Sequence, residues 1–119
     1  MKIYLSANRE LAIRVNNFAE KLKHELGCII TSTWHNHQNR MPSPKVILEQ
    51  IGNSDLIILH GSVPGKESWL EIGNAYARYK KILVLTSKPD IGDLAEWMTD
   101  KVITAPSTMI GFIQENFGE

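Results

Sequence analysis

The chain alternates between short apolar runs and longer stretches in which apolar residues recur every three or four positions. The short runs predict five strands, at residues 2–6, 28–34, 55–60, 81–85 and 101–104. The helical spacing predicts helices at residues 10–26, 43–53, 68–80 and 107–117, with at most a short one at 93–98. Gly27 directly follows the first helical stretch and is expected to end that helix.

Strands and helices alternate from one end of the chain to the other. This order predicts an α/β fold in which a parallel sheet is covered by helices on both faces. Five strands joined by right-handed crossovers favour the doubly wound, flavodoxin-like strand order 2-1-3-4-5. The 119 residues are enough for one domain with a real core, so we expect a single domain spanning 1–119.

The charge and cysteine content narrow the classes of partner. Thirteen Lys and Arg residues balance thirteen Asp and Glu residues, so there is no electrostatic reason to expect a nucleic-acid polymer or an anionic membrane as a partner. Cys28 is the single cysteine and cannot form an internal disulfide. The start of the chain turns polar too early for a signal peptide, and no apolar run approaches the roughly 18 residues that span a bilayer. We therefore expect a cytoplasmic protein.

The predicted topology alone indicates where a ligand would bind. In the order 2-1-3-4-5 the connections change direction between strands 1 and 3, and ligands bind beyond the carboxyl ends of the strands at such a point. The loops there carry the candidate substrate-binding residues Ser6, Asn8, Arg9, Trp34, His60, Gly61, Ser62, Gly65 and Ser68. Helix N-termini with hydroxyls and an arginine suit a phosphate, and an aromatic wall at Trp34 suits a flat base. Ordinary turn and cap residues would produce the same pattern.

Glu71 is the charged residue with two distinct interpretations. It lies in the first turn of the predicted helix at 68–80, where Ser68 and Glu71 form an S-x-x-E capping box with Ser68 at the N-cap. The same position, just beyond the carboxyl end of a parallel strand, also allows the carboxylate to face the crevice. The two interpretations are compatible, because a capping carboxylate can still face a ligand.

Three segments together resemble the nucleoside 2-deoxyribosyltransferase family, which includes the 2′-deoxynucleoside 5′-phosphate N-hydrolases. They are the opening MKIYLSA, the strand SDLIILH and the run WLEIGNAYARYKKILVL, and their order and spacing match over nearly the full chain. The specific part is the E-x-G-x-A-x-A pattern of Glu71, Gly73, Ala75 and Ala77.

The resemblance implies that Glu71 attacks the anomeric carbon of a 2-deoxyribosyl group and expels the base, after which water or a second base resolves the glycosyl-enzyme. It implies that Tyr4 hydrogen-bonds and orients this glutamate. It also implies a nucleoside or nucleotide substrate and a homodimer or higher homo-oligomer. No cofactor is expected.

The chain departs from the family pattern at two places. Ile47 stands where members usually carry an aspartate that assists at the base or sugar, and Gly65 and Glu67 replace an aspartate and a glycine before the helix. Glu49, His35 and His37 are possible substitutes for the missing aspartate, and no spacing argument selects one. His35 and His37 form an H-x-H pair without a suitably spaced third ligand, so we expect no metal site.

Two alternatives therefore accompany the enzymatic interpretation. The first is a nucleotide-binding module with little or no turnover, because the assisting aspartate is absent. The second is a looser resemblance of Ser68-Trp69, Glu71 and KKILVL to Toll/interleukin-1 receptor domains, which implies cleavage of nicotinamide dinucleotides. Within the first interpretation, Arg9, Ser6 and Ser68 favour monophosphates over free nucleosides.

Overall fold

The computed structural model describes residues 1–36, 41–61, 65–88 and 92–117, and the side chains of 93–95 are left out. The strands are β1 (Lys2–Ala7), β2 (Ile29–Ile30), β3 (Leu56–His60), β4 (Lys81–Leu85) and β5 (Lys101–Ile103). The helices are a short 3₁₀ helix η1 (Arg9–Leu11), α1 (Ala12–Leu26), α2 (Pro44–Gly52), α3 (Lys66–Ala77), α4 (Asp93–Met98) and α5 (Pro106–Phe117). Ser62 and His37 lie outside the described residues.

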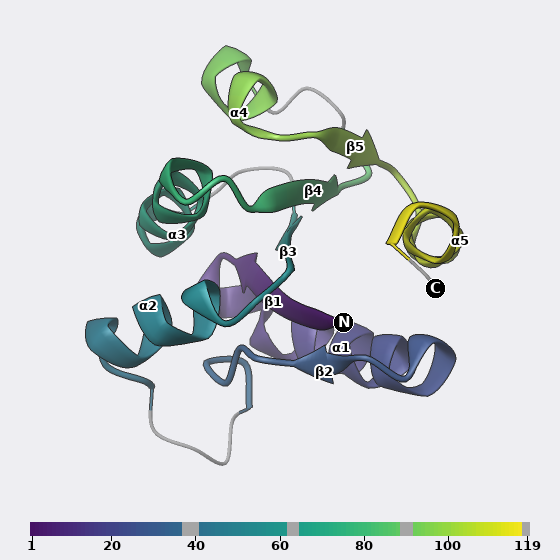
Figure 1. The fold of residues 1–119 in the computed structure, drawn as a ribbon, viewed down its shortest axis with the longest axis horizontal. Helices are drawn as coiled ribbons and strands as arrows, with labels where there is room; N and C mark the ends of the chain where they lie inside the picture. Colours follow the sequence, from purple (N-terminus) through teal and green to yellow (C-terminus); the bar gives the residue numbers. More distant parts are fainter. Residues whose placement is uncertain (37–40, 62–64, 89–91, 118–119) are drawn as a thin grey trace.

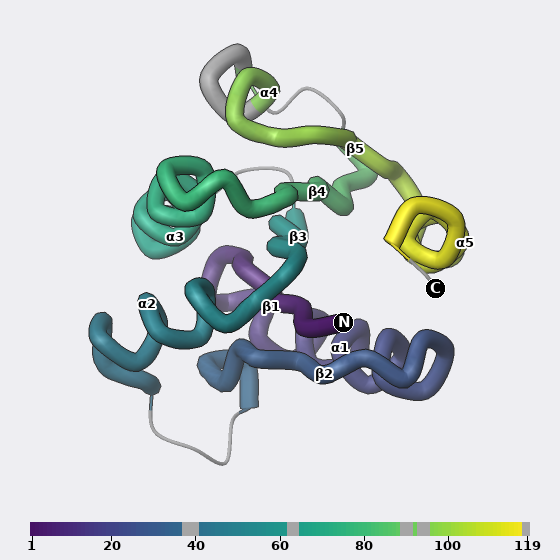
Figure 2. The backbone as a smooth tube through the Cα atoms, in the orientation of Figure 1, coloured from purple at the N-terminus to yellow at the C-terminus, as the bar shows by residue number. Residues whose placement is uncertain are grey.

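The five strands form one parallel sheet in the order β2-β1-β3-β4-β5, which confirms the predicted topology (Figure 1). Helices α1 and α5 pack on one face, and α2, α3 and α4 on the other, as the backbone path also shows (Figure 2). The central strand β3 is buried from Leu56 to Leu59, as its unbroken apolar run requires in a sheet covered on both faces. None of the helices among the described residues is long and apolar enough to cross a membrane.

The register between β1 and β3 determines which side chains share a face. Tyr4 is paired with Ile57, Ser6 with Leu59, and Ala7 with His60. Because successive strand residues point to opposite faces, Tyr4 and Ser6 lie on one face and His60 lies on the other. His60 accordingly packs against Phe18 of α1, with 5.5 Å between the ring centroids.

The second strand is shorter than the predicted 28–34. Its backbone pairing with β1 ends at Thr31, whose N–H donates to the carbonyl of Ile3 at 2.8 Å. Beyond Thr31, side chains make the hydrogen bonds to β1. Ser32 Oγ accepts from the Leu5 N–H at 3.1 Å, and the indole of Trp34 donates to the Leu5 carbonyl at 2.7 Å. The segment after β2 thus stays attached to the sheet without continuing as a strand.

The predicted start of the third major helix is wrong by two residues. Helix α3 begins at Lys66, and Gly65 is its N-cap, with its carbonyl accepting from the Trp69 N–H at 3.0 Å. Ser68 is therefore the third helical residue, and Glu71 lies in the second turn. The capping-box interpretation of these two residues is wrong, because Ser68 is a buried residue within the first turn of the helix and not its N-cap.

Gly27 ends α1 in the left-handed region, with φ of 63°, and its N–H donates to the carbonyl of Lys23. We expect Gly27→Ala to lower the free energy of unfolding by about 1 kcal/mol, because a Cβ strains this backbone conformation. The control is Gly111→Ala inside α5, where a Cβ would also meet no atom within 4 Å. That change should instead stabilise the protein by up to about 1 kcal/mol. Urea denaturation of both variants tests the pair, and equal effects would contradict the explanation.

Candidate active site

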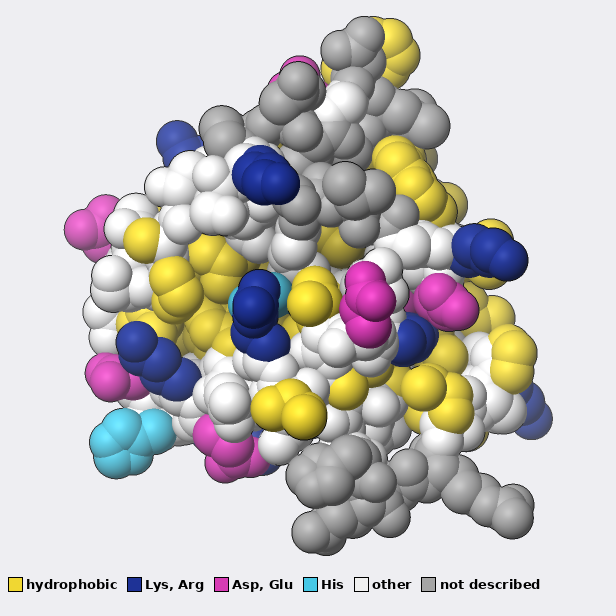
Figure 3. Space-filling model, turned by 180° about the vertical axis from the view of Figure 1, so that it is seen from behind, with side chains coloured by type: hydrophobic (Ala, Val, Ile, Leu, Met, Phe, Trp, Pro, Cys, Tyr) yellow, Lys and Arg dark blue, Asp and Glu magenta, His cyan; other side chains and the backbone are white. Residues whose placement is uncertain are grey.

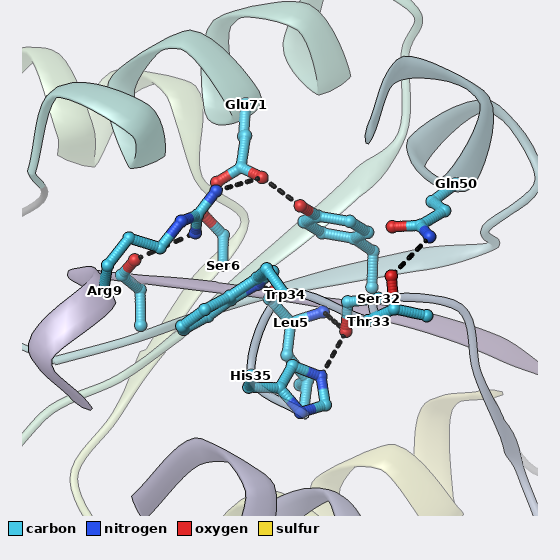
Figure 4. A network of polar contacts seen from close by, with 11 residues as sticks. Leu5, Ser6, Arg9, Ser32, Thr33, Trp34, His35, Gln50 and Glu71 are labelled. Atoms are coloured by element: carbon cyan, nitrogen blue, oxygen red, sulfur yellow. Dashed lines mark hydrogen bonds and ion pairs between the residues drawn. The ribbon is translucent and has the colours of Figure 1, made fainter. Parts of the chain in front are cut away.

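The carboxylate of Glu71 is buried, with 4% of the residue exposed, and three side chains donate hydrogen bonds to it (Figure 4). The phenol of Tyr4 donates to Oε2, Ser6 Oγ donates to Oε1 at 3.0 Å, and Arg9 Nη2 donates to Oε2 at 3.2 Å. The arginine contact is also an ion pair. Residues from the beginning of the chain and from helix α3 thus converge on one carboxylate.

The periodicities of a strand and a helix produce this convergence. Tyr4 and Ser6 are two residues apart on β1 and face the same side of the sheet. Helix α3 packs on that side, and its buried residues Ser68, Glu71, Ile72 and Ala75 form the inward stripe. Glu71 therefore occupies a core-facing position, where a charged group requires hydrogen-bond partners.

The electrostatics of the cluster favour a protonated phenol beside an ionised carboxylate. Burial is the main cause that raises the pKa of Tyr4, and the neighbouring Glu71 raises it further. The phenol therefore stays a donor, and three donors directed at one group suit an ionised carboxylate, which only accepts. Among the described residues, Oε1 accepts a side-chain hydrogen bond only from Ser6, while Oε2 accepts from Tyr4 and Arg9. Oε1 thus keeps more lone-pair capacity for other contacts.

Arg9 and Trp34 form a stacked pair beside the carboxylate. The guanidinium carbon of Arg9 lies 4.2 Å from the centroid of the Trp34 ring, and Arg9 Nη1 donates to the Ala7 carbonyl at 3.3 Å. Trp34 is itself buried. The predicted aromatic wall is therefore present next to Glu71, but its ring stacks on the guanidinium of Arg9.

A buried polar chain holds the segment that carries Trp34. Ser32 Oγ accepts from the Leu5 N–H and lies 2.8 Å from Nε2 of His35, while Nδ1 of His35 lies 3.0 Å from Oδ1 of Asn16. These partners suit a neutral ring that accepts at Nε2 and donates from Nδ1. Burial, followed by the charges of Lys23 and Arg9, lowers the pKa of His35 to about 4.

The sequence did not predict this polar chain. From the sequence, His35 is a possible substitute for the missing aspartate, and Ser32 and Asn16 have no expected role. The spacing of three residues between Ser32 and His35 is the one local signal that fits a turn contact. Both ring nitrogens of His35 have protein partners, so neither is open to a metal or a substrate in this arrangement.

The remaining predicted residues are divided between two sides of the sheet. Oδ1 of Asn8 accepts from the Glu10 N–H at 3.4 Å and caps η1, and a Cβ on Gly65 would lie 3.6 Å from Cγ of Asn8. Ser68 lies on the Glu71 side, and its hydroxyl has no hydrogen-bond partner among the described residues. His60 faces α1 and, with Gly61, lines a cleft on that side of the sheet.

Of the candidate substitutes for the missing aspartate, the described residues Glu49 and His35 make no hydrogen bond or ion pair with Glu71. Glu49 is exposed on α2, and Ile47 is partly buried against the core. His35 is occupied by the polar chain, and His37 lies outside the described residues.

No protein-family model and no curated protein sequence matches the chain, but solved structures share its fold. A CMP N-glycosidase from Clostridium botulinum is 19% identical with a TM-score of 0.67, covering 97% of this chain and 99% of that one. A conserved protein from Enterococcus faecalis is 17% identical with a TM-score of 0.70, covering 97% and 98%. A 2-deoxyribosyltransferase from Bacillus psychrosaccharolyticus is 20% identical with a TM-score of 0.70, covering 92% and 90%. The shared fold extends over nearly the whole of each chain.

Proposed function

We propose that this protein cleaves or transfers the N-glycosidic bond of 2′-deoxynucleosides or their 5′-monophosphates, with Glu71 as the nucleophile. The observation that carries the proposal is the buried Glu71 carboxylate, held by donors from Tyr4, Ser6 and Arg9. Two proteins with the same fold are named for an N-glycosidase and a 2-deoxyribosyltransferase activity, which supports the family resemblance of the sequence.

The proposed reaction has two displacements at C1′ of the sugar. Oε1 of Glu71 forms a bond to C1′ while the C1′–N bond breaks, and the electron pair leaves with the base, which takes up a proton. Water or a second base then attacks C1′ and breaks the ester to Glu71. With water, the second step releases the sugar and a proton, so the net reaction consumes one water molecule.

Each neighbour of Glu71 has a role in this scheme. Tyr4 and Ser6 fix the carboxylate by hydrogen bonds, which reduces the entropy lost on reaching the attack geometry. Arg9 pairs with Glu71 only while the carboxylate is charged. Formation of the glycosyl ester removes that charge and leaves the guanidinium available to an anion, such as a 5′-phosphate. This exchange of partners favours monophosphates over free nucleosides.

The aspartate that assists the leaving base in the family is replaced by Ile47 in this chain. Ile47 cannot donate a proton, and His35 is neutral near pH 7 because burial lowers its pKa to about 4. The base must then draw its proton from solvent or leave without one. The same observation favours the second candidate function, a nucleotide-binding module with little or no turnover. A homodimer and a cytoplasmic location remain predictions of the resemblance and of the composition.

A base-release assay tests the proposal. The substrates are CMP, dCMP, deoxycytidine, the corresponding purine compounds and NAD, each with and without a second free base. We expect base release from the 2′-deoxynucleotides, faster by about tenfold than from the free deoxynucleosides, because one ionic contact is worth about 1.4 kcal/mol when partly buried. Equal or faster use of the free nucleosides would contradict the phosphate preference.

The other outcomes of this assay distinguish the alternative functions. Product formation that requires the second base identifies a transferase, and release in water alone identifies a hydrolase. Saturable binding without release supports the binding module. Release of nicotinamide from NAD as the dominant reaction would replace the proposal with dinucleotide cleavage.

A further inference from the structure

A cleft lies on the face of the sheet opposite to Glu71. It has a volume of about 610 Å³ and lies between α1 and the carboxyl ends of β3, β4 and β5. Phe18, His60 and Leu85 contribute rings and apolar surface, and Arg14, Lys21 and Thr104 contribute polar groups. Figure 3 shows the molecule from behind, where Lys and Arg side chains border a patch of hydrophobic side chains with a histidine at its edge. A cleft of this volume suits one small molecule.

The cleft is separate from the Glu71 cluster. Strand register places His60 on the α1 face, whereas Tyr4 and Ser6 point to the α3 face. None of the three side chains that donate to Glu71 lines the cleft. The turn at residues 8–10 is the place where the two sites approach each other, because Asn8 and Glu10 line the cleft while Arg9 reaches Glu71.

The charge of the cleft favours an anion. Arg14 and Lys21 are seven residues apart on α1, which places them two turns apart on one side of the helix. Neither has an ion-pair partner among the described residues. Glu10 is the one acidic residue among the described residues that line the cleft. Two cations without partners therefore border a space with a single carboxylate.

The apolar part of the cleft favours a flat ring. The side chains of Leu11, Phe18 and Leu85 line it, and the rings of Phe18 and His60 are tilted by 58° to each other. Nδ1 of His60 is buried and has no hydrogen-bond partner among the described residues. Burial, and then the charge of Arg14, lowers the pKa of His60, so its ring is neutral at pH 7. A buried polar atom without a partner is uncommon, and a ligand or a water molecule in the cleft would supply one.

We propose that this cleft binds a small aromatic anion, a molecule with a flat apolar ring and one phosphate or carboxylate, independently of the substrate at Glu71. The ring lies against Phe18 and Leu85, and the anionic group lies at the rim between Arg14 and Lys21. The His60 ring offers one further hydrogen bond, from the buried side of the cleft.

Titration of the ¹⁵N-labelled protein with phenyl phosphate, followed by amide NMR shifts, tests the proposal. We expect saturable shifts along α1 at Arg14, Phe18 and Lys21 and after β4 at Thr86 and Ser87. Benzyl alcohol, which lacks the charge, should bind at least about fivefold more weakly, because it makes no ionic contact. Benzoate should shift the same amides if the site accepts carboxylates as well as phosphates, and failure of benzoate would restrict the site to phosphates.

A pair of double variants supplies the control. Arg14→Ala/Lys21→Ala should raise the dissociation constant for phenyl phosphate at least about fivefold. Lys23→Ala/Lys45→Ala removes the same charge outside the cleft and should leave the constant unchanged. All four side chains are exposed, so both variants should fold, which circular dichroism checks.

Three results would overturn the proposal: no saturable shifts, shifts gathered at Tyr4 and Glu71, or equal weakening in the two double variants. The readout is binding without turnover. A protein that releases no base but binds phenyl phosphate at α1 would therefore refute the proposed function and support the second site.

Discussion

Glu71→Gln is expected to lower kcat/KM for base release by at least about a thousandfold, because the amide oxygen is a far weaker nucleophile than the carboxylate. The substitution keeps the size of the side chain and an acceptor for the hydroxyl of Ser6. Glu67→Gln is the matched control, since Glu67 is exposed in the first turn of the same helix. That variant should keep the activity of the wild type.

The fold should survive the loss of the Glu71 charge. Arg9 loses its ion-pair partner, but 17% of its side chain is exposed and the guanidinium can turn toward solvent. We therefore expect the free energy of unfolding to fall by about 1–2 kcal/mol, measured by urea denaturation. Full activity in Glu71→Gln would exclude the nucleophile role. Mass spectrometry of an acid-quenched reaction should locate a glycosyl adduct on the peptide that contains Glu71 in the wild type and none in the variant.

His35→Gln is expected to remove much of the acid sensitivity of the fold between pH 6.5 and pH 4. The pKa of His35 is about 4 in the folded protein, against 6.5 for an ordinary histidine. In this window the unfolded chain binds a proton at His35 that the folded protein does not, so stability is complete above pH 6.5 and falls as the pH drops. The difference corresponds to about 3 kcal/mol at pH 4. A glutamine can accept from Ser32 and donate to Asn16 without titrating.

Urea denaturation of the wild type and His35→Gln at several pH values between 4 and 7.5 measures this linkage. His24→Gln is the control, because His24 is exposed on the last turn of α1. We expect the control to follow the wild type. Some acid sensitivity should persist in His35→Gln, because burial also lowers the pKa of His60 and acts in the same direction. Parallel curves for the wild type and His35→Gln would show that His35 does not carry the effect.

Local patterns failed at the start of α3 for an identifiable reason. An S-x-x-E motif fits an N-cap at Ser68, but the same spacing of three also places Ser68 and Glu71 on one face of a helix that has already begun. In the structure Gly65 is the N-cap, three residues before Ser68, and Ser68 is buried because the helix packs against the sheet. Sequence alone does not distinguish a helix that starts at Ser68 from one that starts earlier, because both satisfy the same periodicity.

The second error concerned the face of the sheet on which His60 and Glu71 lie. His60 is the last residue of β3, and Glu71 lies in the helix that follows it. From the sequence we expected both residues in one crevice. The pleat of the strand separates them, since His60 pairs with Ala7 and faces α1 while Tyr4 and Ser6 face α3. His60 therefore lies on the opposite face of the sheet from Glu71, whereas the sequence predicted both in one crevice.

The sequence by itself determined the parallel sheet and its strand order, because short-range periodicity and the handedness of crossovers depend on neighbouring residues. The pairing of Tyr4 with Glu71 followed from the family resemblance, and the structure contains that hydrogen bond. Only the tertiary structure brought Arg9 and Ser6 onto the Glu71 carboxylate and joined His35 to Ser32 and Asn16. These contacts join segments up to 65 residues apart, as between Ser6 and Glu71. They depend on strand register and on the face against which each helix packs, and packing of the whole chain sets both.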